Sequence, residues 1–409
     1  MVRKRQSEKV EPSGDVSIDL ASKVGFTPIG SSDYSEVKDF LPTFLPNVDS
    51  ILGGGIPFGR ITEVFAPEAV GKSTFMIYLT KIATKLGVDT FWIDTEGTSD
   101  PERMTELGVE VDKAFVFQPN NDKGENMDIE TVQQKIEDII SAYDTPEYRE
   151  RPVLIIWDSV GMTESRAESE TAAGDKAQLG RQAAAVTAMI RKISPRIKTI
   201  NMAFVAVNQI RANLQMMNKY DTKYTRPGGK ALEHSESLRL ELRKGTKIMQ
   251  NFDEDKTPSQ VGQIVHVITD KNKLERPKQR TDVVLASGWI MPKTKDEQYG
   301  AKDITLDGID YVYNLYATGV ELGILKTAGA YKKYVDPETG EVISAYELDW
   351  LRMIAQNDEF RRKLALEETK AIFTRKPPAY INNKHIDISV WDEVKPIADY
   401  YKGVTDAGE

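Results

Sequence analysis

The sequence contains no cysteine and only three histidines, at His234, His266 and His385. Without cysteine the chain has no disulfide, no thiolate metal site and no cysteine nucleophile, and a cytoplasmic setting fits best. Three histidines scattered this widely also argue against a zinc site. The chemistry of this protein must therefore rest on other residue types.

Long apolar runs and an excess of positive charge are missing as well. No apolar run approaches the ~18 residues that a membrane span requires, so we expect no membrane association. The charged start, MVRKRQSEKVEPSGD, leads into no apolar segment and is expected to be a short tail, not a secretory signal. The net charge of −9 argues against binding nucleic acid through overall charge, so a role on DNA needs local basic patches.

Apolar and charged segments are instead well mixed, with 40% hydrophobic and 29% charged residues in a chain of 409. Strands and helices alternate, which indicates an α/β fold with a largely parallel sheet. We expect strands at 59–67, 90–94, 151–158 and 202–208, and helices at 72–87, 128–143 and 178–193. We expect an exposed connection between two strands at 245–260, a tail and oligomerisation arm at 1–45, a core at 46–300 and a small α/β domain at 301–409.

The stretch APEAVGKST, residues 66–74, has the second half of a phosphate-binding loop at a strand-to-helix junction. Ala66 stands where the pattern has glycine, which is tolerable if its φ is negative and costs about 1 kcal/mol or more if positive. Lys72 would reach the β and γ phosphates of ATP, and Ser73 would hold Mg²⁺. The residues expected to surround the phosphates are Pro67, Glu68, Ala69, Val70, Gly71, Lys72, Ser73 and Thr74.

Two carboxylates at strand ends complete a hydrolytic site. Asp158 ends the apolar strand VLIIWD and is the candidate second magnesium residue, although such a residue can also cap a turn. Glu96 follows the strand TFWID and is the candidate that orients or deprotonates water. Taken alone, Glu96 could equally be a surface glutamate.

Basic residues concentrate in two stretches of this acidic chain. Residues 176–198 carry Lys176, Arg181, Arg191, Lys192, Arg196 and Lys198 with no acid. Residues 211–230 carry Arg211, Lys219, Lys223, Arg226 and Lys230 against Asp221 alone. These are the local patches that DNA binding requires, and a solvated face is the alternative. The pair Gly228-Gly229 would let the backbone approach phosphates closely.

From residue 48 to 290 the chain resembles the RecA recombinases, and in particular the phage UvsX-like branch. The motifs that carry this resemblance occur in family order: GGGIPFGRITEVFAPEAVGKST, WIDTEGTSDPERM, WDSVGMTES, VNQIR, RPGGKAL and DKNKLERP. The stretch YATGVELGILKTAGAYKKYVDPETGE is similar to the small domain that follows the family's core.

The resemblance implies a RecA-type P-loop ATPase that forms a helical filament on single-stranded DNA, pairs it with a homologous duplex and exchanges strands. It implies that Glu96 activates water and that Gln209 senses the γ-phosphate. Lys271 and Lys273 would reach a nucleotide held by the next protomer, and Asp100 and Arg103 would lie near the nucleotide.

The resemblance also implies two DNA loops, at 162–176 and 211–230. The DNA-binding residues expected are Thr187, Arg191, Arg211, Arg226, Gly228, Gly229 and Lys230. The implied partners are single- and double-stranded DNA, further copies of this chain, a recombination mediator and a single-strand-binding protein. The implied location is the cytoplasm of a bacterial cell, and whether the gene is viral or cellular stays open, as does ATP against dATP preference.

The chain departs from the family pattern at four places. Arg103 replaces a tyrosine that stacks on adenine, and Lys230 replaces the amide of a GGN motif. His234 replaces an aromatic residue tied to cooperativity, and the acidic tail is reduced to DAGE. A guanidinium can also stack on a base, so Arg103 is retained as a nucleotide contact.

Two other functions share part of these features. A ring-forming RecA-fold ATPase would also need Lys72, Asp158 and Glu96. A nucleotide-dependent binding module, such as a recombination mediator, would bind DNA with negligible turnover. Neither explains why the two lysines 271 and 273 occur together with a basic loop that contains paired glycines.

Overall fold

The computed structural model describes residues 16–29, 37, 39–97, 99–118, 127–169, 180–212, 224–251, 257–291, 304–383 and 385–406. The chain divides into two compact units, Met1–Val37 and Lys38–Glu409. In the first unit, helix α1 (Val16–Lys23) leaves apolar side chains such as Leu20 exposed. All features described below belong to the second unit.

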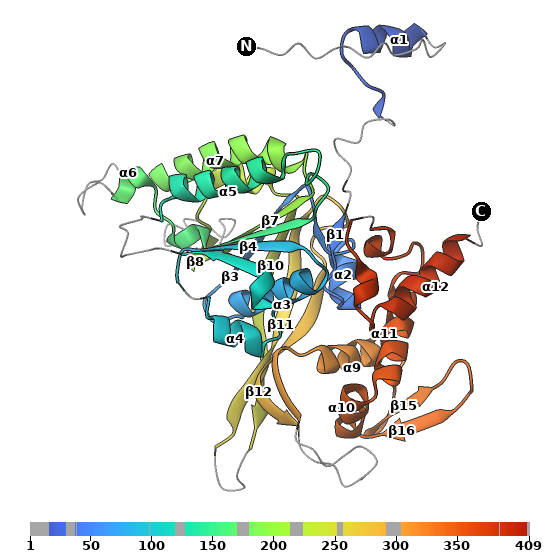
Figure 1. Ribbon diagram of the computed structural model, residues 1–409. Coiled ribbons are helices and arrows are strands. Elements are labelled where there is room, and N and C mark those ends of the chain that lie inside the picture. The colour runs from blue at the N-terminus through green and yellow to red at the C-terminus, as the bar shows by residue number, and fades with distance from the viewer. Residues whose placement is uncertain are drawn as a thin grey trace, which may run out of the picture. The chain divides into compact units, whose positions relative to one another are not determined.

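A nine-stranded sheet forms the centre of the second unit, in the order β13-β12-β11-β10-β3-β7-β6-β4-β5 (Figure 1). Neighbouring strands from β10 to β5 run parallel, whereas β10 to β13 pair antiparallel. The strands are β3 (Ile61–Ala66), β4 (Asp89–Asp94), β5 (Ala114–Phe117), β6 (Val153–Asp158), β7 (Met202–Gln209), β10 (Leu238–Gln250), β11 (Ser259–Asn272), β12 (Arg280–Met291) and β13 (Ile304–Ile309). The predicted α/β fold with a largely parallel sheet is confirmed.

Helices cover both faces of the parallel part of the sheet (Figure 1). Helix α3 (Lys72–Lys85) lies on one face, and α5 (Ile129–Tyr143) and α7 (Arg181–Ile197) lie on the other. Every residue of β6 is buried; Leu154 and Ile156 belong to the hydrophobic cluster of α3, while Ile155 and Trp157 belong to that of α5 and α7. Parallel strands that are buried on both faces read as continuous apolar runs, which explains the sequence VLIIW.

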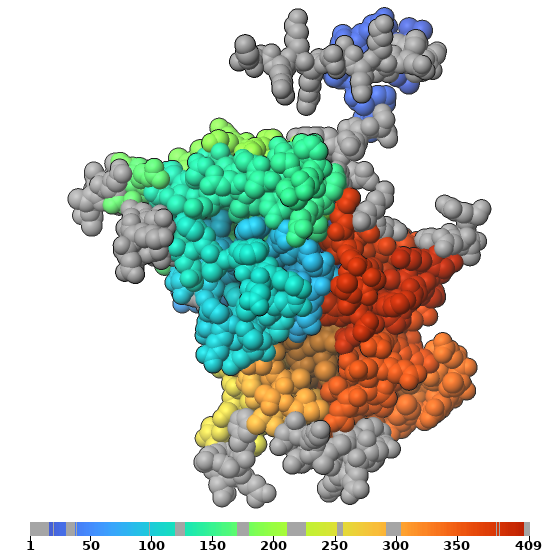
Figure 2. All heavy atoms as spheres, in the orientation of Figure 1, coloured from blue at the N-terminus to red at the C-terminus, as the bar shows by residue number. Residues whose placement is uncertain are grey.

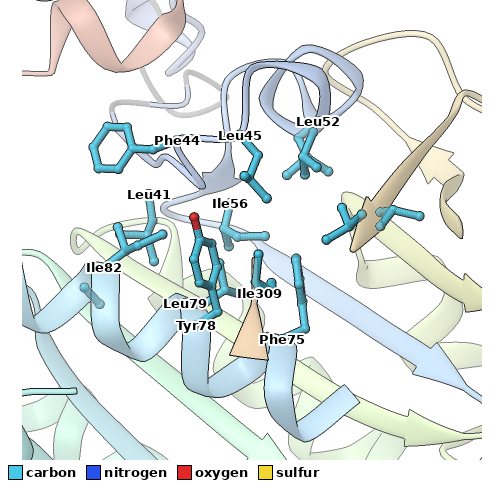
Figure 3. Packing of buried hydrophobic residues seen from close by; sticks show 14 of the residues in the cluster. Leu41, Phe44, Leu45, Leu52, Ile56, Phe75, Tyr78, Leu79, Ile82 and Ile309 are labelled. Carbon is cyan, nitrogen blue, oxygen red and sulfur yellow. The ribbon is translucent and has the colours of Figure 1, made fainter. Parts of the chain in front are cut away.

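Residues 40–57, which precede strand β3 and the phosphate loop, pack directly on α3. Strand β1 (Phe40–Leu41), helix α2 (Pro46–Leu52) and strand β2 (Ile56–Pro57) contribute apolar side chains that meet α3 (Figure 3). Tyr78 of α3 donates a hydrogen bond from its hydroxyl to the carbonyl of Thr43 at 2.8 Å. These contacts tie the helix that follows the phosphate loop to the N-terminal part of the unit.

Strands β10 and β11 form a longer hairpin than the sequence suggested. The exposed connection predicted at 245–260 is wrong in part, because β10 continues to Gln250 and β11 begins at Ser259. Lys247 pairs with Gln263 and Gln250 with Ser259. Backbone pairing extends the ladder beyond the sheet body, so polar side chains there do not mark a loop.

The C-terminal region packs on the core with helices α9 (Tyr311–Glu321), α10 (Glu347–Gln356), α11 (Asp358–Ile372) and α12 (Lys395–Asp406) and the strands β14 (Lys326–Ala328), β15 (Tyr331–Val335) and β16 (Val342–Ala345). Its side chains Trp350, Leu364 and Tyr401 share one hydrophobic cluster with α3, and the two surfaces meet in Figure 2. The boundary predicted at residue 300 stays a prediction. In the described part of the chain, no helix has the length and apolar content to cross a membrane.

Candidate nucleotide and DNA site

The loop between β3 and α3 takes the form expected of a phosphate cradle. Ala66 is the last residue of β3 and pairs with Gln209 of β7. The left-handed backbone lies at Ala69, with φ of 52°, and at Gly71, with φ of 104°. Ala66 is therefore tolerated because it is a strand residue, and the strain of about 1–2 kcal/mol falls on Ala69.

Two strands of the antiparallel half hold this loop from outside. Gln263 of β11 donates from Nε2 to the carbonyl of Val70 at 3.1 Å. A Cβ at Gly71 would lie 2.1 Å from Cδ1 of Leu285 on β12. Gly71 is therefore required both by its φ and by this close approach.

Lys72 lies inside the cradle, with only 8% of its surface exposed. Its Nζ donates to the carbonyl of Pro67 at 3.0 Å and lies 3.4 Å from that of Ala66. Burial lowers the pKa of Lys72, although Asp158, Glu96 and Glu68 act in the opposite direction. The ammonium group is thus held within its own loop by carbonyl oxygens.

Asp158 meets the test for a magnesium residue. It is 4% exposed and lies near the Ser73 side chain, which acts to lower its pKa, while its Oδ2 is buried without a hydrogen-bond partner. Burial raises the pKa of Asp158 to about 7; Glu96 and Asp94 add to this, against the attraction of Lys72. A buried carboxylate oxygen without a partner, beside a hydroxyl, suits a hydrated Mg²⁺.

Glu96 is positioned by residues that the sequence analysis did not select. Ser159, joined to Asp158 by a cis peptide bond, donates from Oγ to Oε1 of Glu96 at 2.6 Å. Asp94 accepts from the backbone N–H of Glu96 at 3.2 Å and of Ser99 at 2.8 Å. Asp94 is fully buried, so it fixes the turn that presents the exposed Glu96. The motifs TFWIDTEG and WDSVG contain both residues, but only the pairing of β4 with β6 brings them together.

Asp100 and Arg103 lie on helix α4 (Pro101–Glu106). Asp100 caps the helix by accepting from the N–H of Glu102 at 2.9 Å. The guanidinium of Arg103 donates two hydrogen bonds to Asp307, at 2.6 and 2.7 Å. Both terminal nitrogens of the guanidinium are therefore engaged, and a base would stack on its face. Contact with the nucleotide stays a prediction for both residues.

Gln209 lies beside the cradle, at the end of the strand adjacent to β3. Its neighbour Asn208 is fully buried and donates from Nδ2 to Glu63 at 2.9 Å and to the carbonyl of Pro227 at 2.9 Å. The end of the predicted second DNA loop is thus anchored beside the residue predicted to sense the phosphate. Asn208 was missed because only its neighbour carries the family role.

Much of the predicted DNA interface lies outside the described residues. This applies to residues 170–176 and 213–223 of the two predicted loops, and the side chain of Arg211 is also outside the described part. What is described is the end of the second loop and helix α8 (Gly229–Ser235).

The paired glycines allow α8 to approach α7. Gly228 has a φ of 96° and Gly229 a φ of 71°. A Cβ at Gly229 would lie 2.9 Å from the Cβ of Ala183, whose carbonyl accepts from the Thr187 hydroxyl at 2.6 Å. Lys230 and Arg191 are exposed on these two helices. The structure therefore brings the glycine pair close to Thr187 but leaves the two cations in solvent.

Unlike the exposed Lys230 and Arg191, Arg226 is held by contacts within the protein. Its Nη1 lies 3.0 Å from Oε2 of the buried Glu63, and its guanidinium lies over the ring of Phe65 at 4.9 Å. Arg226 is thus an anchor of the loop end in this state.

Lys271 and Lys273 end strand β11 beside α8. Lys271 donates from Nζ to the carbonyl of Glu233, and both lysines lie near the carbonyl of His234, at 3.5 and 3.4 Å. Cations are favoured at the carboxyl end of a helix. The two lysines predicted for a neighbour's nucleotide therefore contact the helix that follows the second DNA loop.

Comparison with known proteins agrees with this geometry. Residues 21–289 match the family described as the RecA N-terminal domain. The chain belongs to the RecA family. It is 30% identical to protein RecA of Aquifex pyrophilus over 82% of this chain and 85% of that protein. It is 29% identical to protein RecA of Thermotoga neapolitana over 77% and 78%, and 31% identical to that of Thermus aquaticus over 74% and 78%.

Membership of the RecA family confirms the main functional prediction. This RecA-family protein is a DNA-dependent ATPase that forms filaments on single-stranded DNA and carries out homologous pairing and strand exchange in recombination and repair. The roles of its individual residues stay predictions. Among the described residues, no group of three or more His, Asp or Glu side chains is placed to hold a metal ion.

Proposed function

We propose that this RecA-family protein binds ATP and Mg²⁺ between protomers, on the loop 66–74 of one copy and on Lys271 and Lys273 of the next. The observation that carries the proposal is the contact of both lysines with the carboxyl end of α8. Because α8 follows the second DNA loop, a nucleotide that attracts the lysines changes the support of that loop. ATP binding and DNA binding are thereby coupled.

In the first half of the site, the described residues have complementary tasks. Lys72 exchanges the carbonyls of Ala66 and Pro67 for phosphate oxygens, which are better partners for a buried cation. Ser73 and Asp158 hold Mg²⁺, whose charge, when bound, offsets that of the phosphates. Glu96 holds the attacking water and accepts its proton, with Ser159 fixing the carboxylate.

Beside the cradle, a contact between the Asn208 side chain and the backbone of Pro227 connects the nucleotide to the DNA loop. Gln209 follows Asn208, which is bonded to Pro227 just before the paired glycines. A change at Gln209 on γ-phosphate binding is therefore transmitted to the loop end. Lys230, exposed at the start of α8, serves as a phosphate contact.

We further propose that the chain belongs to the UvsX-like branch and acts in the cytoplasm with a mediator and a single-strand-binding protein. The support is the set of departures at Arg103, Lys230 and His234. A mediator that accelerates loading of this chain, but not of a RecA protein from one of the relatives named above, would test the branch assignment.

The decisive experiment for the shared site mixes two inactive variants. Lys72→Ala lacks the first half and Lys271→Ala/Lys273→Ala lacks the second. In a random equal mixture on single-stranded DNA, about a quarter of the interfaces contain both intact halves, because each half must come from a different neighbour. We expect about that fraction of the wild-type hydrolysis rate to return. If the mixture stays as inactive as its components, ATP is not shared between protomers.

A further inference from the structure

We propose that Glu236 is a positioning residue that connects Lys271 with Arg226 through the guanidinium of Arg239 and the carboxylate of Glu233. Lys271 faces the nucleotide of the neighbour, and Arg226 anchors the second DNA loop. The proposal rests on the shared ATP site proposed above, and it assigns the link between that site and the loop to one side chain.

Glu236 is buried to an unusual degree for a carboxylate. It is the residue that ends α8, and its side chain is 0% exposed. Neither of its oxygens has an aligned hydrogen-bond partner. Two cations approach Oε1: Nη1 of Arg239 lies at 2.9 Å and Nζ of Lys271 at 3.9 Å. A buried carboxyl of this kind is very sensitive to the removal of either cation.

A second buried carboxyl of this network is Glu63 on β3, the strand that leads into the phosphate loop. Burial and the repulsion of Glu63 raise the pKa of Glu236 to about 9, against the attraction of Arg239 and Lys271. Glu63 in turn accepts from Asn208 at 2.9 Å and pairs with Arg226 at 3.0 Å.

A third acidic residue makes the two arginines compete. Oε1 of Glu233 lies 3.4 Å from Nη2 of Arg226 and 3.2 Å from Nη1 of Arg239. When Lys271 moves to a neighbour's phosphates, Arg239 is left as the cation nearest to Glu236. Arg239 then interacts more strongly with Glu236 and more weakly with Glu233. Arg226 must then adjust between Glu63 and Glu233. Because Arg226 begins the segment RPGG, this adjustment moves the DNA-facing backbone.

Asp270 lies beside this network but is not part of the connection between Lys271 and Arg226. Asp270 lies 2.7 Å from Nε of Arg239 and also pairs with Lys278. Asp270 therefore holds the far side of Arg239, leaving its Nη1 to the two glutamates. This division explains how one arginine can stabilise the buried Glu236 without being drawn to the surface.

The test compares Glu236→Ala with Glu236→Gln. The measured quantity is the ratio of ATP hydrolysis with a single-stranded thymidine oligonucleotide to hydrolysis without it. We expect Glu236→Ala to lose about tenfold of the stimulation while the basal rate stays close to wild type, which is within the usual range of a coupling between sites. Glu236→Gln keeps the size of the side chain and an oxygen that can accept from Arg239, and it should retain most of the stimulation.

The matched control is Glu368→Ala on α11. Glu368 is also 0% exposed, and its oxygens also lack hydrogen-bond partners. This variant should change thermal unfolding but leave the stimulation ratio unchanged, which separates loss of coupling from loss of stability.

The outcomes distinguish the two proposals. If the mixture of Lys72→Ala with Lys271→Ala/Lys273→Ala recovers no hydrolysis, the shared ATP site is refuted, whatever Glu236 does. A wild type that shares its site, together with a Glu236→Ala variant that is stimulated normally, overturns the role of Glu236. If Glu236→Ala does not fold, Glu233→Gln weakens the connection between Arg239 and Arg226 from the other side. Normal stimulation of Glu233→Gln would equally overturn the proposal.

Discussion

The proposed ATP site has two walls: the loop 66–74 with Asp158 and Glu96 forms the first, and Lys271 and Lys273 of the next protomer form the second. The two walls differ in how completely contacts within one protomer order their side chains. In the first wall, Asp94 accepts hydrogen bonds from Glu96, Ser99 and Gln118, and Ser159 bonds Glu96. In the second wall, Lys271 and Lys273 donate to main-chain carbonyls of their own α8, and Lys271 also lies 3.9 Å from the carboxyl of Glu236. The first wall is therefore preorganised to bind nucleotide, whereas the second wall contacts nucleotide only when a neighbouring protomer supplies it. Binding and hydrolysis should therefore be separable by mutation.

The largest effect is expected from the first wall. Lys72→Ala removes the ammonium group of the cradle, which Asp158, Glu96 and Glu68 attract. We expect nucleotide affinity to fall by about 100-fold or more, since a buried charge-assisted contact to phosphate is lost. Titration with a fluorescent ATP analogue measures this. Lys395→Ala, which removes an exposed lysine paired with Asp399, is the control and should bind normally. Affinity within threefold of wild type would show that Lys72 does not contact the nucleotide.

The second wall should behave differently. Lys271→Ala leaves the cradle intact, so an isolated protomer should bind the analogue within about twofold of wild type. DNA-stimulated hydrolysis should fall by about 100-fold, because a cation is missing where charge develops in the transition state. Loss of nucleotide affinity in the dilute protomer, equal to that of Lys72→Ala, would instead place Lys271 in the first wall.

The difference between the walls also marks what the sequence could reveal. Lys72, Asp158, Glu96 and Gln209 follow strand ends, and parallel strands bring their carboxyl ends to one sheet edge, so their proximity could be predicted. The contact of Lys271 with α8 depends on the antiparallel pairing of β10 with β11, which no local pattern specifies.

Two further features could not be predicted from the sequence: the burial of Glu236 and the position of the left-handed residue in the phosphate loop. Glu236 lies in EHSES, a polar stretch typical of a surface, and its burial follows only from the tertiary structure, which places it beside Arg239 of β10 and Lys271 of β11. Ala66 drew attention as the missing glycine, yet the left-handed φ falls at Ala69. Which residue of a loop takes the unusual backbone depends on where the preceding strand ends.

On the DNA side, an exposed and an anchored cation offer a sharper form of the same comparison. Lys230→Ala removes an exposed charge, so the slope of log affinity for single-stranded DNA against log salt should fall by about 0.7. Arg226→Ala should leave that slope nearly unchanged. It removes the partner of Glu63, so we expect a loss of unfolding free energy of about 3 kcal/mol, as for a broken buried ion pair. Salt titrations by fluorescence anisotropy and chemical denaturation measure the two quantities. Equal slopes for both variants would contradict the distinction.

The smallest effect is expected at Arg103, where the first wall meets Asp307. Arg103→Ala breaks an exposed, two-bonded ion pair, which is worth about 0.2–1 kcal/mol of unfolding free energy. Arg103 lowers the pKa of Asp307. A carboxylate with a lowered pKa stabilises the fold above its unfolded pKa, and this contribution is lost as the pH falls through the folded value.

The stability difference between wild type and Arg103→Ala should therefore be present at neutral pH and disappear in acid. Asp307→Asn removes the same pair without touching the arginine and should match it in thermal unfolding. Nucleotide affinity separates the two roles of Arg103. If the face of the guanidinium stacks on the base, Arg103→Ala weakens binding by severalfold while Asp307→Asn does not. If the two variants bind ATP equally well, Arg103 serves the fold, and the first wall holds its nucleotide by the phosphates.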